Sequence, residues 1–309
     1  LEIDMPERQV VLAPDGRVQA ILPRQRHDSH RLIEEFMIAA NVAAAETLEA
    51  RGNPCLYRVH DKPDAAKVEA LRAFLAELGL AVAAGQLQRP GHFTAFLGRD
   101  ANGPLAFLIN DLVLRSQAQA VYSHENIGHF GLGLGRYAHF TSPIRRYADL
   151  LVHRALISAL GLGEGGLPAD GAPLIAAAGE HLSTTERRAD AASRDCLDRY
   201  ASLFLAERVG ETFAGRIGGV TRFGLFVRLN DLGIDGLVPL GSLPSDYYDH
   251  DSGRHALVGR RDGGTYRLGD QVEVRLTAAD PITGSLVMEL IGERPAPASG
   301  RPRTTTRRR

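Results

Sequence analysis

Residues 128–153 read GHFGLGLGRYAHFTSPIRRYADLLVH, and the rest of the chain is organised around this stretch. Its closely spaced glycines are typical of a loop or edge strand whose backbone can approach a ligand closely. Thr141-Ser142-Pro143 predicts the start of a helix, because Ser142 suits the N-cap and Pro143 the first helical position. Apolar residues then follow at the spacing of one buried helical face, namely Ile144, Tyr147, Ala148, Leu151, Val152 and Ala155. We therefore expect this helix to pack against the core by that face.

The other face of the predicted helix carries charge. Arg145, Asp149 and His153 follow one another at intervals of four residues, with Arg146 beside them. Two arginines in the first turn oppose the usual preference for acidic residues at the positive end of the helix dipole. A bound phosphate would resolve this conflict, because free N–H groups and guanidinium groups both bind anions. A solvated arginine pair is the alternative, and the spacing alone favours it over a phosphate site.

The composition is that of an ordinary globular protein. Of the 309 residues, 44% are hydrophobic and 24% are charged. A chain of this length can form two domains. No apolar run reaches the roughly 20 residues of a membrane span, and the first residues show no signal-peptide pattern. Cys55 and Cys196 stand far apart without zinc-ligand spacing, and the 11 histidines are scattered. We expect a cytosolic chain with free thiols that does not enter a membrane.

Charge is distributed unevenly along the chain. The formal net charge is −1, but residues 293–309 contain six arginines and one glutamate, a local charge of +5. A tail rich in Pro, Ser, Thr and Arg cannot form a packed core, so we expect it to be disordered. Such a tail either attracts RNA phosphates in a salt-dependent way or only increases solubility, and the composition does not separate the two.

Residues 1–208 show mainly helical patterns. A strand pair is predicted at 8–12 and 17–22, and short strands at 57–60 and 118–122. Helices are predicted at 28–50, 64–79, 91–97, 105–116 and 177–208. In the first of them we expect Ile33, Phe36, Met37, Ala40 and Ala44 to face inward. The chain does not begin with Met, which suggests a piece of a longer protein.

At Gly210 the pattern changes from helical to strand periodicity. Five strand-like runs follow, at 212–217, 224–229, 236–239, 271–278 and 285–290. Five short strands in a segment of this length predict a small closed barrel of the OB type. The fold class is therefore α+β.

The segment at 129–153 resembles the signature of the RNase II/RNase R family of 3′-to-5′ exoribonucleases. Other stretches agree with this resemblance, namely LIEEFMIAAN at 32–41, YRVH at 57–60, LRS at 114–116 and ERRAD at 186–190. The region after Val209 resembles the S1-type RNA-binding domain of the RNase R branch. The resemblance implies the C-terminal part of an RNB catalytic domain at 1–208, an S1-type barrel at 209–292 and the basic tail at 293–309.

The resemblance also implies a set of functional residues. Arg145 is expected to be the catalytic cation, which polarises the scissile phosphate and stabilises its developing charge. Substrate contacts are expected from Arg146, His139, Tyr137, Arg58, His60, Asn41, Glu34 and Arg115. Exposed polar roles are the alternative for Glu34 and Asn41, and a cation at a helix C-terminus is the alternative for Arg115. In the barrel, Phe213, Phe223 and Phe226 are candidates for base stacking, although at least one of these rings is expected to fill the interior.

Metal-assisted hydrolysis requires several carboxylates within a few ångströms, and no such cluster is evident. Asp111, Asp149 and Asp195 are isolated in the sequence. In the family, the aspartate cluster lies upstream of the region that corresponds to Leu1. We therefore expect no metal ligands in this chain and no activity from it alone. The full-length protein is expected to be a monomeric, Mg²⁺-dependent, processive exoribonuclease that acts on single-stranded RNA 3′ ends and releases nucleoside 5′-monophosphates.

Two other functions remain open at this point. The chain is alternatively a non-catalytic RNA-binding module, as the missing carboxylates suggest, or a degenerate relative that serves as a scaffold. One departure supports the scaffold. Ser193 occupies the position of a glutamate that the RNase II branch uses near the RNA 3′ end.

Overall fold

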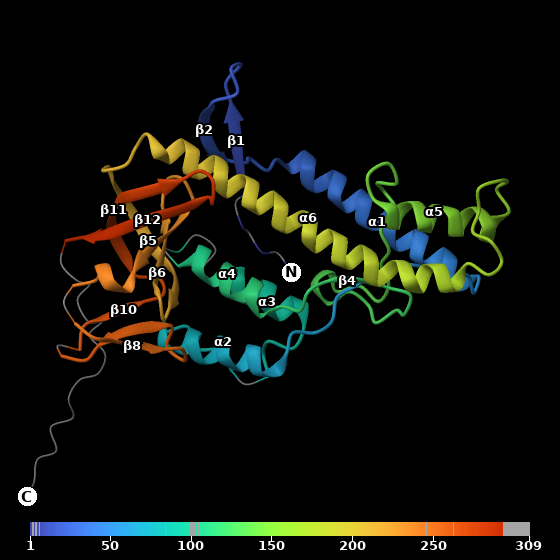
Figure 1. Ribbon diagram of the computed structural model, residues 1–309. Coiled ribbons are helices and arrows are strands. Elements are labelled where there is room, and N and C mark those ends of the chain that lie inside the picture. The colour runs from blue at the N-terminus through green and yellow to red at the C-terminus, as the bar shows by residue number, and fades with distance from the viewer. Residues whose placement is uncertain are drawn as a thin grey trace, which may run out of the picture. The chain divides into compact units, whose positions relative to one another are not determined.

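The computed structural model describes residues 1–292 apart from 2, 4, 6, 84, 99–102, 104, 245 and 262, so the predicted basic tail at 293–309 lies outside the described residues. The chain divides into two compact units (Figure 1). The first comprises Leu1–Glu7 and Arg24–Arg194, and the second comprises Arg8–Pro23 and Asp195–Arg309. No helix in the described part of the chain is both long and apolar enough to span a membrane.

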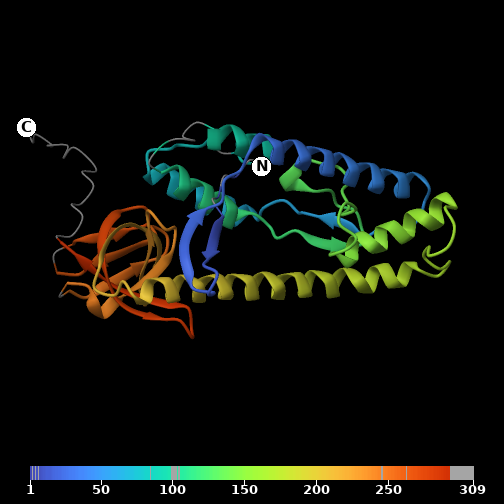
Figure 2. The ribbon, with the colours of Figure 1, turned by 90° about the horizontal axis from the view of Figure 1, so that it is seen from above.

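The first unit is mainly helical, as predicted. Its helices are α1 (Asp28–Ala50), α2 (Ala65–Glu77), α3 (Pro90–Leu97), α4 (Ala106–Ser116), α5 (Tyr147–Leu160) and the first part of α6 (Ala172–Ala206). The strands β3 (Tyr57–Val59) and β4 (Val121–Ser123) pair antiparallel, with Arg58 opposite Tyr122. Figure 2 shows this pair between α1 and α6. Asp64 caps α2, because its carboxylate accepts hydrogen bonds from the N–H groups of Ala66 and Lys67.

Two hydrophobic clusters hold the first unit together. One surrounds β3 and β4 and joins α1, α5 and the start of α6 through Leu48, Leu151 and Ile175, all fully buried. The other joins α2, α3 and α4 through apolar residues that include Leu75, Phe93 and Val113.

The inward face predicted for α1 is largely wrong. Phe36 is 63% exposed, and Ile33 and Met37 are also exposed, whereas the buried face begins at Asn41 and continues through Ala44, Ala45 and Leu48. The reason is that, within the described part of this unit, the cluster around β3 and β4 covers only the second half of the helix. The apolar spacing was correct, but no described residues form a core against the first half of the helix.

The helix predicted to have Ser142 as its N-cap begins four residues later. Pro143–Arg145 form a turn, Arg146 is the N-cap of α5, and Ile144 is fully exposed rather than buried. The turn closes on itself because the N–H groups of Arg145 and Arg146 both donate to the Ser142 carbonyl. Tyr147 is also exposed, so the buried face keeps only four of the predicted residues, Ala148, Leu151, Val152 and Ala155.

The second unit contains the predicted five-stranded barrel. Its strands are β5 (Thr212–Thr221), β6 (Gly224–Leu229), β7 (Asp235–Pro239), β11 (Gln271–Asp280) and β12 (Ser285–Ile291). They close in the order β11-β12-β7-β6-β5, with β12 and β7 parallel. Gly224 must be glycine because its φ is +147° and a Cβ would collide with the Val238 carbonyl oxygen.

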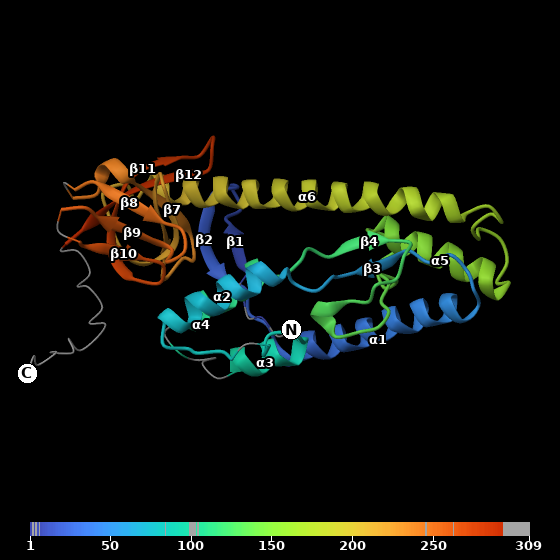
Figure 3. The same ribbon diagram turned by 90° about the horizontal axis from the view of Figure 1, so that it is seen from below.

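Two smaller sheets complete this unit. The insertion between β7 and β11 forms a three-stranded sheet of β8 (Tyr248–Asp251), β9 (Ala256–Gly259) and β10 (Thr265–Arg267) (Figure 3). The predicted N-terminal hairpin is confirmed as β1 (Arg8–Leu12) paired with β2 (Val18–Pro23). Ile21 of this hairpin lies in the same core as the barrel residues, so the hairpin packs with the second unit.

Candidate functional site

The loop at 128–146 is held on one side by His60. The Nδ1 of His60 accepts a hydrogen bond from the Gly131 N–H at 2.7 Å, and its Nε2 donates to the Ala118 carbonyl at 2.7 Å. A Cβ at Gly131 would lie 2.8 Å from the same Nδ1, so only glycine allows this approach. One nitrogen of His60 therefore holds the loop, and the other fixes the imidazole to the backbone at Ala118.

Asn41 of α1 holds the loop on another side. Its Nδ2 donates to the Tyr137 hydroxyl and its Oδ1 accepts from the Phe140 N–H, both at 2.9 Å. Asn41 and Tyr137 are both buried. The structure thus brings these two predicted site residues together, in contact with each other.

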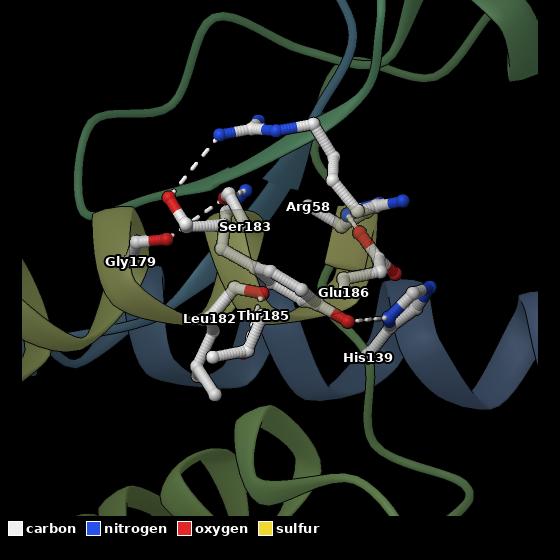
Figure 4. A network of polar contacts seen from close by, with 10 residues as sticks. Arg58, His139, Gly179, Leu182, Ser183, Thr185 and Glu186 are labelled. Atoms are coloured by element: carbon white, nitrogen blue, oxygen red, sulfur yellow. Dashed lines mark hydrogen bonds and ion pairs between the residues drawn. The ribbon is translucent and has the colours of Figure 1, made fainter. Parts of the chain in front are cut away.

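A third set of contacts joins β3, β4, α6 and the loop (Figure 4). Arg58 Nη1 donates to Glu186 Oε2 at 2.6 Å, and the guanidinium lies 4.7 Å from the centre of the Tyr122 ring. The Tyr122 hydroxyl lies 2.9 Å from His139 Nδ1. This chain of contacts fixes His139, a residue of the loop, relative to the first part of α6.

The two histidines of the loop next to Tyr137 are held neutral. Burial lowers the pKa of His139 to about 3, with the guanidinium groups of Arg146 and Arg58 adding to the effect. Burial, with His60 as the next cause, lowers the pKa of His129 to about 4. Positive charge in this region therefore comes from arginine, whose charge does not change over the physiological pH range.

The two signature arginines have different environments. Asp149 is fully buried, and its Oδ1 accepts from the Ser142 N–H and from Arg146 Nη2, both at 2.8 Å. Arg145 is exposed and has no ion pair within the described residues. The arrangement braces Arg146 from the interior and leaves the Arg145 guanidinium available to an anion.

Two predicted site residues lie apart from this cluster. Glu34 pairs with Arg26, and Arg115 pairs with Asp111 at 2.8 Å. Neither makes a hydrogen bond or ion pair with the loop in the described part of the chain. The Arg115 side chain is largely exposed near the end of α4, where a cation suits the helix C-terminus.

The three predicted aromatic residues of the barrel differ in exposure. Phe223 is 64% exposed and has the Arg222 guanidinium 4.7 Å from its ring centre. Phe226 is 41% exposed, whereas Phe213 packs partly against the barrel core. Phe223 and Phe226 therefore present rings at the surface.

Sequence analysis did not place Tyr122 or Glu186 among the site residues. The sequence signal for Glu186 was the ERRAD stretch, but its partner Arg58 lies 128 positions away in the chain. Tyr122 was interpreted only as the last residue of a predicted short strand. No local pattern indicates which distant residue a side chain will contact.

A metal centre does not fit the residues present. Within the described residues, no group of three or more His, Cys, Asp or Glu side chains is placed to hold a metal ion. Asp149 is committed to Ser142 and Arg146, and Asp111 to Arg115.

Comparison with known proteins agrees with this organisation. The RNB domain family matches residues 1–161, and the S1 RNA binding domain family matches residues 207–290. Ribonuclease R of Escherichia coli strain K12 is 42% identical over 305 residues, which cover 96% of this chain and 38% of that protein. Ribonuclease R of Aquifex aeolicus is 44% identical over 291 residues, which cover 94% of this chain and 41% of that protein. The chain thus spans about two fifths of these relatives.

A solved structure agrees in fold. Mycoplasma genitalium RNase R in complex with ribose methylated single-stranded RNA superposes with a TM-score of 0.87 at 26% identity, covering 94% of this chain and 46% of that one. The match runs through both the helical unit and the barrel unit, and the RNB family alone covers more than half of the chain. This chain therefore belongs to the RNase II/RNase R family of RNB-domain proteins.

Proposed function

We propose that this chain provides the RNA-holding part of a cytoplasmic, monomeric 3′-to-5′ exoribonuclease of the RNase R type. The proposal divides the chain into RNB-domain residues 1–208 and an S1-type RNA-binding barrel at 209–292. The substrate is single-stranded RNA, shortened processively from its 3′ end to nucleoside 5′-monophosphates. The RNA complex of the Mycoplasma relative and the S1 family match support RNA as the ligand.

The observation that carries the proposal is the exposed Arg145, which has no ion pair among the described residues, beside Arg146, which Asp149 holds. Because Arg146 is already paired with the buried Asp149, Arg145 is the cation available to bind the scissile phosphate. A guanidinium placed there stabilises the negative charge that develops on the phosphate oxygens during hydrolysis. His139 and Tyr137 belong to the same loop as Arg145, and Arg58 of β3 is joined to this loop through Tyr122. Phe223 and Phe226 are the residues of the barrel that stack on bases.

Magnesium belongs to this proposal, but its ligands do not come from the described residues of this chain. The hydrolytic steps that need the ion are therefore assigned to carboxylates outside them. What these residues contribute is binding, orientation and charge stabilisation of the phosphate.

The test uses a 5′-labelled single-stranded RNA, the 309-residue chain and a full-length protein, with Mg²⁺ present. We expect the chain to bind without cleaving and the full-length protein to shorten the RNA from its 3′ end. Arg145→Ala should reduce hydrolysis by about a hundredfold or more, the effect of removing one preorganised group at a developing charge.

Arg188→Ala is the matched control. Arg188 is exposed on α6, two positions from Glu186 and therefore on a different side of the helix, and it has no ion pair in the described part of the chain. Hydrolysis by this control should be unchanged. Wild-type hydrolysis by Arg145→Ala would overturn the role of Arg145, and cleavage by the chain alone would overturn the placement of the metal ligands.

A non-catalytic RNA-binding module remains the second candidate, because the described residues contain no metal-holding group. Binding without cleavage by the full-length protein as well would favour this candidate. The exposed arginine and the surface aromatic residues would then serve binding only.

A further inference from the structure

The Tyr122 hydroxyl lies next to one of the two ring nitrogens of His139, the Nδ1. Tyr122 is only 7% exposed, and its hydroxyl has one hydrogen-bond partner among the described residues, His139 Nδ1 at 2.9 Å. A hydroxyl on a residue this buried favours an acceptor for its proton, and Nδ1 is the acceptor within hydrogen-bond distance among the described residues. An Nδ1 that accepts is unprotonated, so a neutral imidazole carries its hydrogen on Nε2.

Charge and burial keep both groups in these forms. The pKa of His139 falls to about 3 and that of Tyr122 rises to about 12, in each case chiefly because burial disfavours the charged state. Across the physiological range Tyr122 is therefore a neutral phenol and His139 a neutral imidazole.

The Nε2 of His139 is directed away from this bond and remains available. It makes no hydrogen bond within the described residues, yet it is not among the buried unpartnered polar atoms, so it reaches the surface. Arg145 and Arg146 are both near enough to disfavour a charged imidazole at this position. A neutral N–H donor thus lies beside the cationic groups assigned to the RNA phosphate.

The Tyr122 ring is itself held in place. The Arg58 guanidinium covers one face of the ring at 4.7 Å, and Glu186 holds that guanidinium at 2.6 Å. The Tyr122 N–H donates to Ser183 Oγ, which in turn donates to the Gly179 carbonyl of α6. The hydroxyl therefore has little freedom to turn away from His139.

We propose that Tyr122 is a positioning residue for RNA: its hydroxyl fixes His139 as an Nε2–H donor, and that donor binds an oxygen of the RNA backbone. The inference rests on the proposed function, in which RNA is the ligand of this site. The opposite tautomer would present a lone pair at Nε2, which repels phosphate and ribose oxygens.

The first test is spectroscopic and does not depend on RNA. Long-range ¹H–¹⁵N spectra of the chain labelled at histidine distinguish protonated from unprotonated ring nitrogens. For His139 we expect Nδ1 unprotonated and Nε2 protonated, and in Tyr122→Phe a mixture of the two tautomers. The Nδ1–H form in the unchanged chain, or no change in Tyr122→Phe, would overturn the proposal.

The second test measures, by fluorescence anisotropy, the dissociation constant of the complex between the 309-residue chain and a short single-stranded oligoadenylate. Tyr122→Phe keeps the ring under Arg58 and should weaken binding about three- to tenfold, the effect of one net hydrogen bond. Tyr57→Phe is the matched control, since Tyr57 is buried in the same cluster and its hydroxyl has no hydrogen bond in the described part of the chain. Its affinity should be unchanged.

A double-mutant cycle separates positioning from direct contact. Glutamine at position 139 presents an amide N–H without tautomers, so Tyr122→Phe should cost nothing further in a His139→Gln background. An undiminished loss in that background would mean that Tyr122 contacts RNA itself and would overturn the proposal. Repeating the comparison with an all-2′-deoxy oligonucleotide identifies the acceptor. If the acceptor is a phosphate oxygen, the loss of affinity in Tyr122→Phe persists; if it is the ribose 2′-hydroxyl, the loss disappears.

The two proposals fail in different ways. If the unchanged chain does not bind oligoadenylate, the proposed function fails. If it binds and shows the expected tautomer, but Tyr122→Phe binds equally well, only the role of Tyr122 fails.

Discussion

Replacing Asp149 with asparagine would remove one charge from the interior at nearly constant volume. The carboxylate is fully buried and accepts hydrogen bonds from the Ser142 N–H and from Arg146 Nη2, both at 2.8 Å. After the change, the partly buried Arg146 would have no counter-charge in the described part of the chain. The turn that carries Arg145 would also lose the charged partner of its Ser142 N–H. We therefore expect Asp149→Asn to destabilise the helical unit.

The magnitude follows from the burial of the two partners. Breaking a buried ion pair by removing one partner costs about 3–5 kcal/mol of unfolding free energy. The Arg146 side chain is 25% exposed, so water screens part of this penalty. A cost of about 2–3 kcal/mol lowers the midpoint of thermal unfolding by roughly 5–10 °C for a unit of this size.

Thermal unfolding of the 309-residue chain, followed by circular dichroism, measures this shift. Glu69→Gln is the matched control, because Glu69 pairs with Arg72 at the same three-residue spacing but on an exposed surface. The control should leave the midpoint unchanged. A shift below about 2 °C in Asp149→Asn, or equal shifts in both variants, would refute the argument that burial makes this pair important.

Three further outcomes are expected. Phe223→Ala should weaken RNA binding by about 1–3 kcal/mol in a titration without changing the melting temperature, whereas Phe213→Ala, which truncates a partly buried ring, should lower the melting temperature. Gly131→Ala should destabilise the chain in urea unfolding, because its methyl group would lie 2.8 Å from His60 Nδ1. Folding lowers the pKa of His139 from 6.5 to about 3, so its protonation favours the unfolded chain. Its contribution to the unfolding free energy should be fully present above pH 6.5 and should be lost as the pH falls from 6.5 towards 3. Urea titrations across this range should show a shallower decrease for His139→Gln.

Much of the fold was predictable because local patterns carry it. The barrel strands, the N-terminal hairpin and α1 to α4 appear where periodicity, turn residues and caps placed them. These signals are local, since each depends on residues within a few positions of one another. Asp64 is an example, because its carboxylate caps the next residues along the chain.

The errors concern which side chains become buried, because periodicity alone does not decide what packs against a helical face. Ile144 has the spacing of a buried helical residue. It lies instead in the turn closed by the Ser142 carbonyl, before the helix begins, and is exposed. Phe36 has the correct periodicity for a core, but in the described part of the unit no apolar surface lies against it. Asp149 was placed on the polar face and is instead fully buried, because Arg146 and the turn close over it.

The sequence by itself determined the fold class, the barrel and the family, because these depend on periodicity and on a long signature in order. It also identified Arg145 as the central candidate. Only the tertiary structure decided which side chains meet: Asn41 with Tyr137, Arg58 with Glu186, and Tyr122 with His139. The physical reason is that hydrogen bonds and ion pairs act over about 3 Å in space, whereas these partners lie 96, 128 and 17 positions apart in the chain.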